Sequence, residues 1–548
     1  MNRDQDLARL RTEEFDVLVI GGGASGAGCA LDSVLRGYKT ALIDKTDFAA
    51  ETSSRSTKLI HGGVRYLEQA FTKLDFGQLA QVKHGLQERH TVLRNAPHLT
   101  KAQALITPVF SWFEGMYYTI GLKLYGAFAS SKDNLPGSRW LSKKEAEEAI
   151  PGLSPKVHSA VLYYDGQLDD ARYCLAIAQT AAEQGAAVVN HLEILDFEKN
   201  SDGQLTAARG RDTLTGEEVR IKAKVFLNCT GPFADYLRQK ANADLPKRLR
   251  PSKGVHAILP EDILGGDDAL LIPATKDGRV VFAIPFYGKT MLGTTDDAYD
   301  TLDREPVLDD KEVDYLLETL ARYVKKTVQA RDVTAGFGGL RPLVSGDPEK
   351  GTASLLRDHQ VEHDKASNLV SLLGGKWTTY RVMAQDAMDY IAQQLLPNDQ
   401  ACTTERQYLV GGEHFRVDNW QKIQTATQLP EATCRYLSRQ YGDRYETLLT
   451  ILQENAGYAE PLVAGFPYLK GEVIFAARHE MACTVRDFLA RRIRLEILDW
   501  DAAQRAAGEV ARLLGNELGW PEQAHVSAAE DYIDLLYQFR EEALSVSV

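Results

Sequence analysis

The chain has 548 residues, which is too long for one hydrophobic core, so we expect two or three domains. Its composition is ordinarily globular, and the net charge of −13 argues against extended contact with nucleic acid. The six cysteines show no CxxC or zinc-type spacing, so we expect free thiols and no metal site. The sequence lacks both an apolar export signal at its start and a run of about 18 apolar residues, so it predicts neither export nor a membrane span.

The first predicted element is an apolar strand over residues 15–20, which breaks into a glycine-rich turn at 21–28. Gly21, Gly23 and Gly26 fit the pattern in which backbone closely approaches a pyrophosphate. A helix over 27–36 would point its free N–H groups at that phosphate. A second strand over 39–43 ends at Asp44, where such folds place a carboxylate on ribose hydroxyls. Together these elements predict a dinucleotide site; the alternative is a turn that only packs helix on strand.

Two segments downstream have unusual composition: residues 51–66 are largely polar, and residues 102–131 are rich in aromatic side chains. The polar run at 51–58, followed by HGGVRY at 61–66, is too rich in Ser and Thr for a core element and is typical of a site loop. After a predicted helix over 76–93, the stretch at 102–131 is rich in aromatic residues. This stretch could form a surface that contacts lipid or a hydrophobic electron acceptor. The alternative is an ordinary core helix with flanking loops, and the sequence alone favours this alternative.

The middle of the chain alternates between helical and strand patterns. A helix is predicted over 171–184, and a strand over 217–228 runs into NCTGP, where Gly231 would expose backbone to a cofactor. Short segments between 254 and 294 predict an antiparallel sheet, and a helix follows at 309–326. Beyond about residue 400, including the arginine-rich segment 485–498, helical patterns dominate.

The sequence GGKWTTYR at 374 follows an apolar strand predicted over 369–373. Thr378 or Thr379 is a plausible N-cap for a helix that begins there, and such a helix start can hold a second polar part of a cofactor. A helix that is simply well capped is the alternative interpretation.

Two residues are candidates for chemistry. His256 lies on a predicted strand among apolar neighbours, where a histidine is more often structural; it becomes a candidate base if it faces the cofactor. Arg341 precedes Pro342, which biases it toward an extended backbone and a fixed guanidinium direction suited to carboxylate or phosphate. A structural salt bridge is the alternative for Arg341.

Ten segments in this order resemble the FAD-dependent glycerol-3-phosphate dehydrogenases, the aerobic bacterial and mitochondrial type within the glycine and D-amino-acid oxidase-like flavoproteins. They are GGGASGAG at 21, TSSRSTKLIHGGVRYLE at 52, APHL at 96, LPGS at 135, DDAR at 169, NCTGP at 228, KGVH at 253, GTTD at 293, GGLRPL at 338 and GGKWTTYR at 374. The resemblance extends over about residues 14–500. Asp44, Cys229 and Trp377 depart from the commoner glutamate, alanine and leucine, without removing a necessary group.

The resemblance implies an α/β fold with a Rossmann-like FAD-binding domain, an antiparallel-sheet substrate domain and an all-α C-terminal domain. The first two domains would interleave within 14–398, with FAD-binding parts at about 14–66, 160–235 and 335–398 and substrate parts at about 67–159 and 236–334. The helical domain would occupy 399–548.

The activity implied is oxidation of sn-glycerol 3-phosphate to dihydroxyacetone phosphate by hydride transfer to FAD, with electrons passed to a membrane quinone. By motif position, His256 and Arg341 would be catalytic, and Arg65, Tyr66 and Lys376 would bind substrate. The residues expected to bind the cofactor are Gly21, Gly23, Gly26, Asp44, Ser53, Ser54, Lys58, His61, Gly62, Gly231, Gly375 and Thr378.

We also expect a homodimer attached peripherally to the cytoplasmic face of the cell membrane. Alternatives are an oxidase that uses oxygen, a sister enzyme acting on a hydroxy acid or amine, and a non-catalytic flavin-binding protein. The acidic balance disfavours an RNA-modifying flavoprotein.

Overall fold

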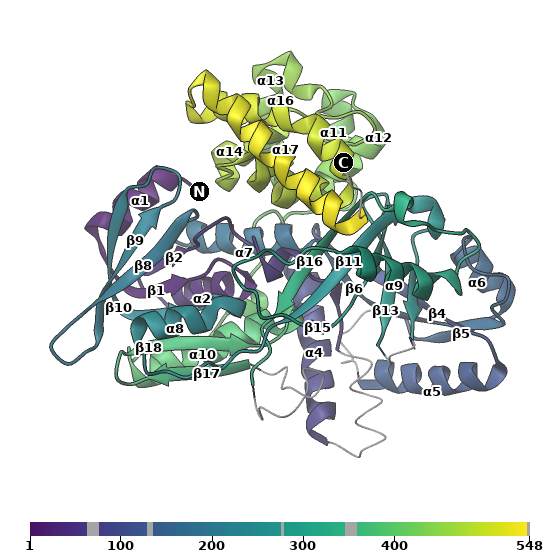
Figure 1. Ribbon diagram of the computed structural model, residues 1–548, viewed down its shortest axis with the longest axis horizontal. Helices are drawn as coiled ribbons and strands as arrows, with labels where there is room; N and C mark the ends of the chain where they lie inside the picture. The colour runs from purple at the N-terminus through teal and green to yellow at the C-terminus, as the bar shows by residue number, and fades with distance from the viewer. Residues whose placement is uncertain (63–75, 129–134, 274, 276–278, 346–358, 545–548) are drawn as a thin grey trace.

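The computed structural model describes residues 1–62, 76–128, 135–273, 275, 279–345 and 359–544. Two sheets lie side by side, and a group of C-terminal helices lies above them in the view of Figure 1. The predicted fold class is confirmed in all three parts: a Rossmann-like sheet, a largely antiparallel sheet and a helical C-terminal domain.

The first sheet has eight strands, with β17-β18-β10-β1-β2-β7 in order and β9 and β8 continuing from β10. Their bounds are β1 Glu14–Ile20, β2 Thr40–Ile43, β7 Ala187–Val189, β8 Leu192–Lys199, β9 Leu205–Asp212, β10 Glu218–Asn228, β17 His359–Asp364 and β18 Leu369–Gly374. The central pairs β18-β10, β10-β1, β1-β2 and β2-β7 are parallel. Their residues form continuous apolar runs because helices cover both faces of the sheet.

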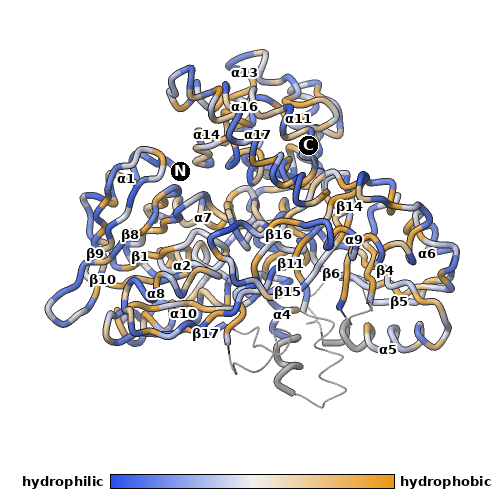
Figure 2. Tube along the Cα trace, viewed as in Figure 1, coloured by the Kyte–Doolittle hydropathy of each residue, from blue (hydrophilic) through white to orange (hydrophobic). Residues whose placement is uncertain are grey.

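Five helices cover this sheet: α1 Arg3–Thr12, α2 Ala24–Leu35, α7 Asp170–Glu183, α8 Ala234–Ala241 and α10 Tyr380–Gln394. Helix α2 packs between α7 and α10 (Figure 1). Val17 and Val19 of β1 belong to the core beneath these three helices, whereas Leu18 and Ile20 belong to the core on the opposite face. The apolar residues therefore concentrate along the strands and inner helix faces, as the hydropathy colours of Figure 2 show.

The second sheet has ten strands in the order β15-β11-β14-β13-β12-β4-β6-β3, with β16 beside β11 and β5 beside β6. Their bounds are β3 Leu59–Ile60, β4 Thr100–Val109, β5 Arg139–Leu141, β6 Ser159–Leu168, β11 Ser252–Pro260, β12 Ala269–Ile272, β13 Val281–Phe286, β14 Lys289–Gly293, β15 Asp297–Ala298 and β16 Ala335–Arg341. All pairs are antiparallel except β12 with β4. Three strands of this sheet, β3, β6 and β16, fall within or overlap the residue ranges expected for the FAD-binding part. They belong to the second sheet because β3 pairs with β6, β6 with β4 and β16 with β11.

The remaining helices flank this sheet or build the C-terminal domain. They are α4 Phe76–Asn95, α5 Trp112–Phe128, α6 Lys143–Ala149, α9 Asp310–Ala321, α11 Asn419–Thr427, α12 Glu431–Tyr441, α13 Tyr445–Glu454, α14 Gly471–Glu480, α15 Leu495–Leu498, α16 Trp500–Leu518 and α17 Glu522–Leu544. Helix α9 starts with a capping box, in which Asp309 and Glu312 satisfy each other's backbone N–H groups.

The segment 485–498 is not one regular α-helix. A π-helix spans Asp487–Arg492, Arg494 adopts a left-handed backbone with φ of 66°, and α15 follows. Arg491, Arg492 and Arg494 are buried and paired with carboxylates of the first sheet's loops and helices, so polar as well as apolar contacts determine this segment's conformation.

All six cysteines are free thiols, as expected. Among the helices of the described ranges, none combines the length and apolar character needed to cross a bilayer.

Candidate functional site

A cavity of about 920 Å³ lies where the carboxyl ends of β1, β2, β10 and β18 meet strands of the second sheet. Ligands of open parallel sheets bind at this end of the strands. Twelve of the predicted site residues line the cavity: Gly21, Gly23, Asp44, Ser53, His61, Gly62, Gly231, His256, Arg341, Gly375, Lys376 and Thr378. The fold thus brings segments from the whole first 380 residues to one place.

The glycine-rich turn between β1 and α2 fits the predicted phosphate cradle. Gly21 has a φ of 112°, and a Cβ atom there would approach the carbonyl oxygen of Cys229 to 2.6 Å, so only glycine is accommodated. A Cβ atom at Gly26 would overlap the carbonyl oxygen of Gly21, so Gly26 does not line the cavity but lets α2 pack onto the turn. Gly23 and Ser25 line the cavity at the N-terminus of α2, which favours a bound anion.

Asp44 lies at the end of β2, where the sequence predicts a ribose ligand. Its two carboxylate oxygens accept hydrogen bonds from the backbone N–H groups of Gly22, at 2.6 Å, and Thr46, at 2.9 Å. These bonds fix the orientation of the carboxylate against the phosphate turn, and burial raises the pKa of Asp44. Oδ1 also accepts from the hydroxyl of Thr46 at 3.2 Å, so the second lone pair of Oδ2 would give a ribose hydroxyl at this edge of the cavity an oriented acceptor.

The GGKWTTYR segment also lines the cavity. Gly375 has a φ of 90° and leads into a 3₁₀ turn, Trp377–Thr379, before α10. Thr379 is the N-cap residue of α10, but its hydroxyl donates to the carbonyl of Lys376, so the predicted side-chain cap is not formed. The indole N–H of Trp377 donates to the carbonyl of Ser53 at 2.9 Å and joins this segment to the loop that follows β2.

His256 is 2% exposed and its side chain forms part of the cavity wall. Its Nε2 lies 3.1 Å from Oγ1 of Thr57, and its ring stacks on Phe337. Burial, reinforced by the positive charges of Lys58 and Arg341, lowers the pKa of His256 well below its ordinary value. The imidazole is therefore neutral at pH 7 and has an unprotonated ring nitrogen, but its low pKa makes it a weak base in the absence of substrate.

Arg341 ends β16 on the same wall. Its Nη2 donates to Oγ1 of Thr294 at 3.2 Å and to the carbonyl of Thr295 at 2.9 Å, and its Nη1 pairs with Asp296 at 3.4 Å. These contacts hold the guanidinium in one direction, as predicted, although they come from the loop after β14 and not from Pro342. A permanent cation close to a neutral imidazole suits an anionic substrate that loses a proton.

Three predicted cofactor residues do not line the cavity: Gly26, Ser54 and Lys58. Lys58 is fully buried, and its Nζ donates to Oδ2 of Asp170 at 2.8 Å and to the carbonyl of Ser54 at 2.7 Å. Burial lowers its pKa to about 8 even though Asp170 opposes the shift. Ser54 and Lys58 thus lie behind the wall. The predicted substrate ligands Arg65 and Tyr66 are outside the described residues.

Sequence reasoning assigned no role to two glycines that shape the site. A Cβ atom at Gly254 would overlap the guanidinium of Arg341, and one at Gly293 would overlap the imidazole of His256. Both glycines belong to segments that carry the family resemblance, KGVH and GTTD, but their function depends on cross-strand neighbours.

Comparison with known proteins gives consistent results along the chain. A family model described as FAD dependent oxidoreductase matches residues 16–381, and one described as the C-terminal domain of alpha-glycerophosphate oxidase matches residues 402–525. The mitochondrial glycerol-3-phosphate dehydrogenase of Arabidopsis thaliana is 39% identical over 97% of this chain and 88% of its own length. The human mitochondrial glycerol-3-phosphate dehydrogenase is 39% identical over 99% of this chain and 77% of its own.

Among solved structures, the glycerol-3-phosphate dehydrogenase from Bacillus halodurans, complexed with FAD, aligns with a TM-score of 0.80 at 29% identity. The alignment covers 100% of this chain and 98% of that one. The similarity therefore includes both sheets and the C-terminal helices.

Proposed function

Because the chain belongs to the glycerol-3-phosphate dehydrogenases of the FAD-dependent oxidoreductase family, we propose that it oxidises sn-glycerol 3-phosphate to dihydroxyacetone phosphate. The observation that carries this proposal is the convergence of His256, Arg341 and Lys376 on the cavity that also contains the dinucleotide turn. The two cations, Arg341 and Lys376, suit the binding of a phosphate monoester, and the neutral imidazole of His256 suits the acceptance of a hydroxyl proton.

The chemistry divides between the cofactor and the chain. Bound FAD would supply the hydride acceptor for the carbon that is oxidised. His256 accepts the proton of the substrate hydroxyl, while Arg341 and Lys376 bind the phosphate and stabilise the developing carbonyl oxygen. The substrate carries about −1.5 to −2 charges at pH 7 and so offsets the nearby cations, which raises the pKa of His256 and strengthens the base when substrate is bound.

Anaerobic mixing of the purified holoenzyme with sn-glycerol 3-phosphate is expected to bleach the flavin absorbance. Glycerol and glycerol 2-phosphate are the controls, because one lacks the phosphate for the cations and the other lacks a free hydroxyl at the oxidised carbon. A flavin that keeps its colour with sn-glycerol 3-phosphate would reject this substrate and leave the family assignment intact. Admitting first oxygen and then a quinone analogue to the reduced protein separates the oxidase alternative from the dehydrogenase.

A membrane quinone as electron acceptor requires contact with a bilayer, and helix α5 offers a surface for it. Apolar side chains are exposed along one side of this helix, with Phe113 at 76% and Trp112 at 56%; Met116, Tyr117 and Ile120 belong to the same set. On the other side of α5, Gly115 packs against Trp140 and Leu122 is buried. Helix α5 is therefore a surface helix, and the interpretation as an ordinary core helix is wrong for its exposed side. An exposed apolar face with aromatic residues is typical of interfacial helices.

Phe113→Glu is expected to weaken cosedimentation with vesicles of phosphatidylcholine and phosphatidylglycerol by about tenfold, since burial of one phenylalanine contributes about 1.5–3 kcal/mol. Val526→Glu is the matched control, because Val526 is also exposed, at 57%, but lies on α17. Equal binding of both variants, or a wild-type protein that remains in the supernatant, would reject α5 as the contact surface. We also propose that the protein is a homodimer attached peripherally to the cytoplasmic face of the cell membrane.

A further inference from the structure

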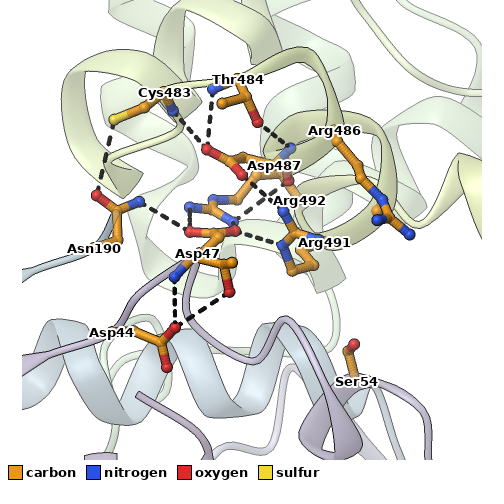
Figure 3. Close-up of polar contacts among 12 residues, drawn as sticks. Asp44, Asp47, Ser54, Asn190, Cys483, Thr484, Arg486, Asp487, Arg491 and Arg492 are labelled. Atoms are coloured by element: carbon orange, nitrogen blue, oxygen red, sulfur yellow. Dashed lines mark hydrogen bonds and ion pairs between the residues drawn. The ribbon is translucent and has the colours of Figure 1, made fainter. Parts of the chain in front are cut away.

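The loop between β2 and the 3₁₀ turn Thr52–Ser54 has two different sides. Asp44, Thr46 and Ala49 line the cofactor cavity, whereas Asp47 is fully buried and is not part of the cavity wall. Figure 3 shows Asp47 directed toward Arg491 and Arg492, with Asp44 on the opposite side of the loop. A loop that contacts the cavity is therefore attached to a C-terminal segment more than 400 positions away.

The attachment is a network of charged hydrogen bonds. Oδ2 of Asp47 accepts from Nε of Arg491 and Nη1 of Arg492, both at 2.6 Å. Oδ1 accepts from Nη2 of Arg492 at 2.9 Å and from the side-chain amide of Asn190 at 3.1 Å. Arg492 thus binds Asp47 through two nitrogens, a geometry that lysine cannot reproduce.

The two arginines are themselves fixed within the C-terminal domain. Nη2 of Arg491 donates to Oδ1 of Asp487 at 2.7 Å, and Nη2 of Arg492 donates to the carbonyl of Glu480 at 2.8 Å. Asp487 in turn accepts from the backbone N–H of Cys483 at 2.9 Å. The guanidinium groups are therefore presented to Asp47 by a rigid support, because each is held from two sides.

From Asp47 the contacts lead directly to the phosphate turn. Thr46, the preceding residue, donates its backbone N–H to Asp44, which accepts from the N–H of Gly22 through its other oxygen. The N–H of Ala49 donates to the carbonyl of Gly22 at 3.1 Å. A displacement of Asp47 would therefore move both the predicted ribose carboxylate and the turn.

The same C-terminal segment also fixes the far end of the loop. Nη2 of Arg494 donates to the carbonyl of Ser54 at 2.7 Å and to Oδ1 of Asp170 at 2.9 Å. Ser53, the neighbouring residue, accepts a hydrogen bond from the N–H of Ala24 in the first turn of α2, at 2.9 Å. Both ends of the loop are thus connected to the cofactor side of the cavity and to the C-terminal domain.

We propose that Arg491 and Arg492 are positioning residues for FAD: through Asp47 they hold the loop that presents Asp44 and Ser53 to the cofactor. The C-terminal domain then completes the cofactor site without contacting the cavity at these residues. This proposal requires FAD as the cofactor but does not depend on the identity of the substrate. Failure of sn-glycerol 3-phosphate to bleach the flavin would therefore reject the proposed substrate and leave this proposal unaffected.

The test is the affinity for FAD, measured by titrating apoprotein with FAD and by following flavin fluorescence after dilution of the holoenzyme. Arg492→Lys keeps the buried positive charge and removes the two-point contact, so the Kd for FAD is expected to rise at least about tenfold. Asp47→Asn, which keeps the side-chain shape, is expected to have the same effect. In holoenzyme, hydrogen exchange of peptides covering residues 44–54 is expected to become faster in Arg492→Lys.

Arg478→Lys is the matched control, since Arg478 lies on α14 of the same domain and pairs with Glu454 and Glu517 away from the loop. It is expected to leave the Kd for FAD and the exchange of 44–54 unchanged. The thermal midpoints of the apoproteins show whether stability alone accounts for a loss of FAD. A Kd within about twofold of wild type in Arg492→Lys, or an equal loss in Arg478→Lys, would overturn the proposal. Should Asp47→Asn fail to fold, Arg492→Lys and the exchange measurement still decide.

Discussion

Gly23→Val is expected to yield a folded protein that carries no FAD. Gly23 forms the wall of the cavity at the N-terminus of α2, and a Cβ atom there would lie 2.9 Å from Oγ of Ser53. The valine methyl groups extend beyond Cβ into the space that a pyrophosphate needs, and the displaced Ser53 hydroxyl would lose its hydrogen bond from Ala24. We expect affinity for FAD to fall by about 100-fold or more, equivalent to about 3 kcal/mol. The flavin absorbance per protein after purification measures this loss.

Gly508→Val is the control for the Gly23 variant. Gly508 lies within α16, and no described heavy atom comes within 4 Å of a Cβ atom built there. It should keep a full complement of FAD and a normal thermal midpoint. A Gly23→Val protein that purifies with normal flavin content would show that the pyrophosphate does not lie against this turn. Gly26→Val is a less specific test, because a side chain there overlaps Gly21 and disturbs the packing of α2.

The first βαβ unit could be predicted almost residue by residue. Strand 15–20, the turn and strand 39–43 became β1, the turn and β2, with boundaries that differ by a residue at most. The prediction succeeded because its signals are local: an apolar run covered on both faces and glycines at fixed spacing. The helix over 27–36 starts earlier, at Ala24, because the glycine turn itself supplies the first turn of α2.

The residues that face away from the cavity could not be recognised from the sequence. Ser54 and Lys58 lie in the same polar segment as Ser53, and nothing local distinguishes the three. Their orientation depends on Asp170 and on Arg494, which is 440 positions from Ser54. Long-range ion pairs of this kind leave no periodic pattern in the sequence.

The environment of His256 was also beyond sequence reasoning. Its partner in the β11-β14 ladder is Gly293, and Gly254 lies beside Gly339 in the β11-β16 ladder. Each missing side chain leaves room for a functional one, the imidazole in the first case and the guanidinium of Arg341 in the second. Register decides these neighbours, and register is set by the whole sheet.

His256→Ala is expected to slow flavin reduction by sn-glycerol 3-phosphate by about 10²–10⁴-fold, the usual contribution of a positioned general base. FAD binding should change little, because the contacts expected to hold the pyrophosphate and ribose belong to Gly23 and Asp44. Stopped-flow absorbance under anaerobic conditions gives the rate and, from its dependence on substrate concentration, the apparent affinity. Added imidazole should restore part of the rate, since truncation leaves a space beside Gly293 and Thr57.

His363→Ala is the matched control, because His363 lies on β17, bonded to Tyr390 and Asn368, and does not line the cavity.

Arg341→Ala should differ from His256→Ala in kind: it removes a cation from the substrate site, so substrate affinity should fall together with the rate. A reduction rate in His256→Ala within about threefold of wild type would exclude His256 as the base. An equal loss of affinity in both variants would instead show that His256 acts by holding the wall around Arg341, since a base that only accepts the proton contributes to the rate and little to binding.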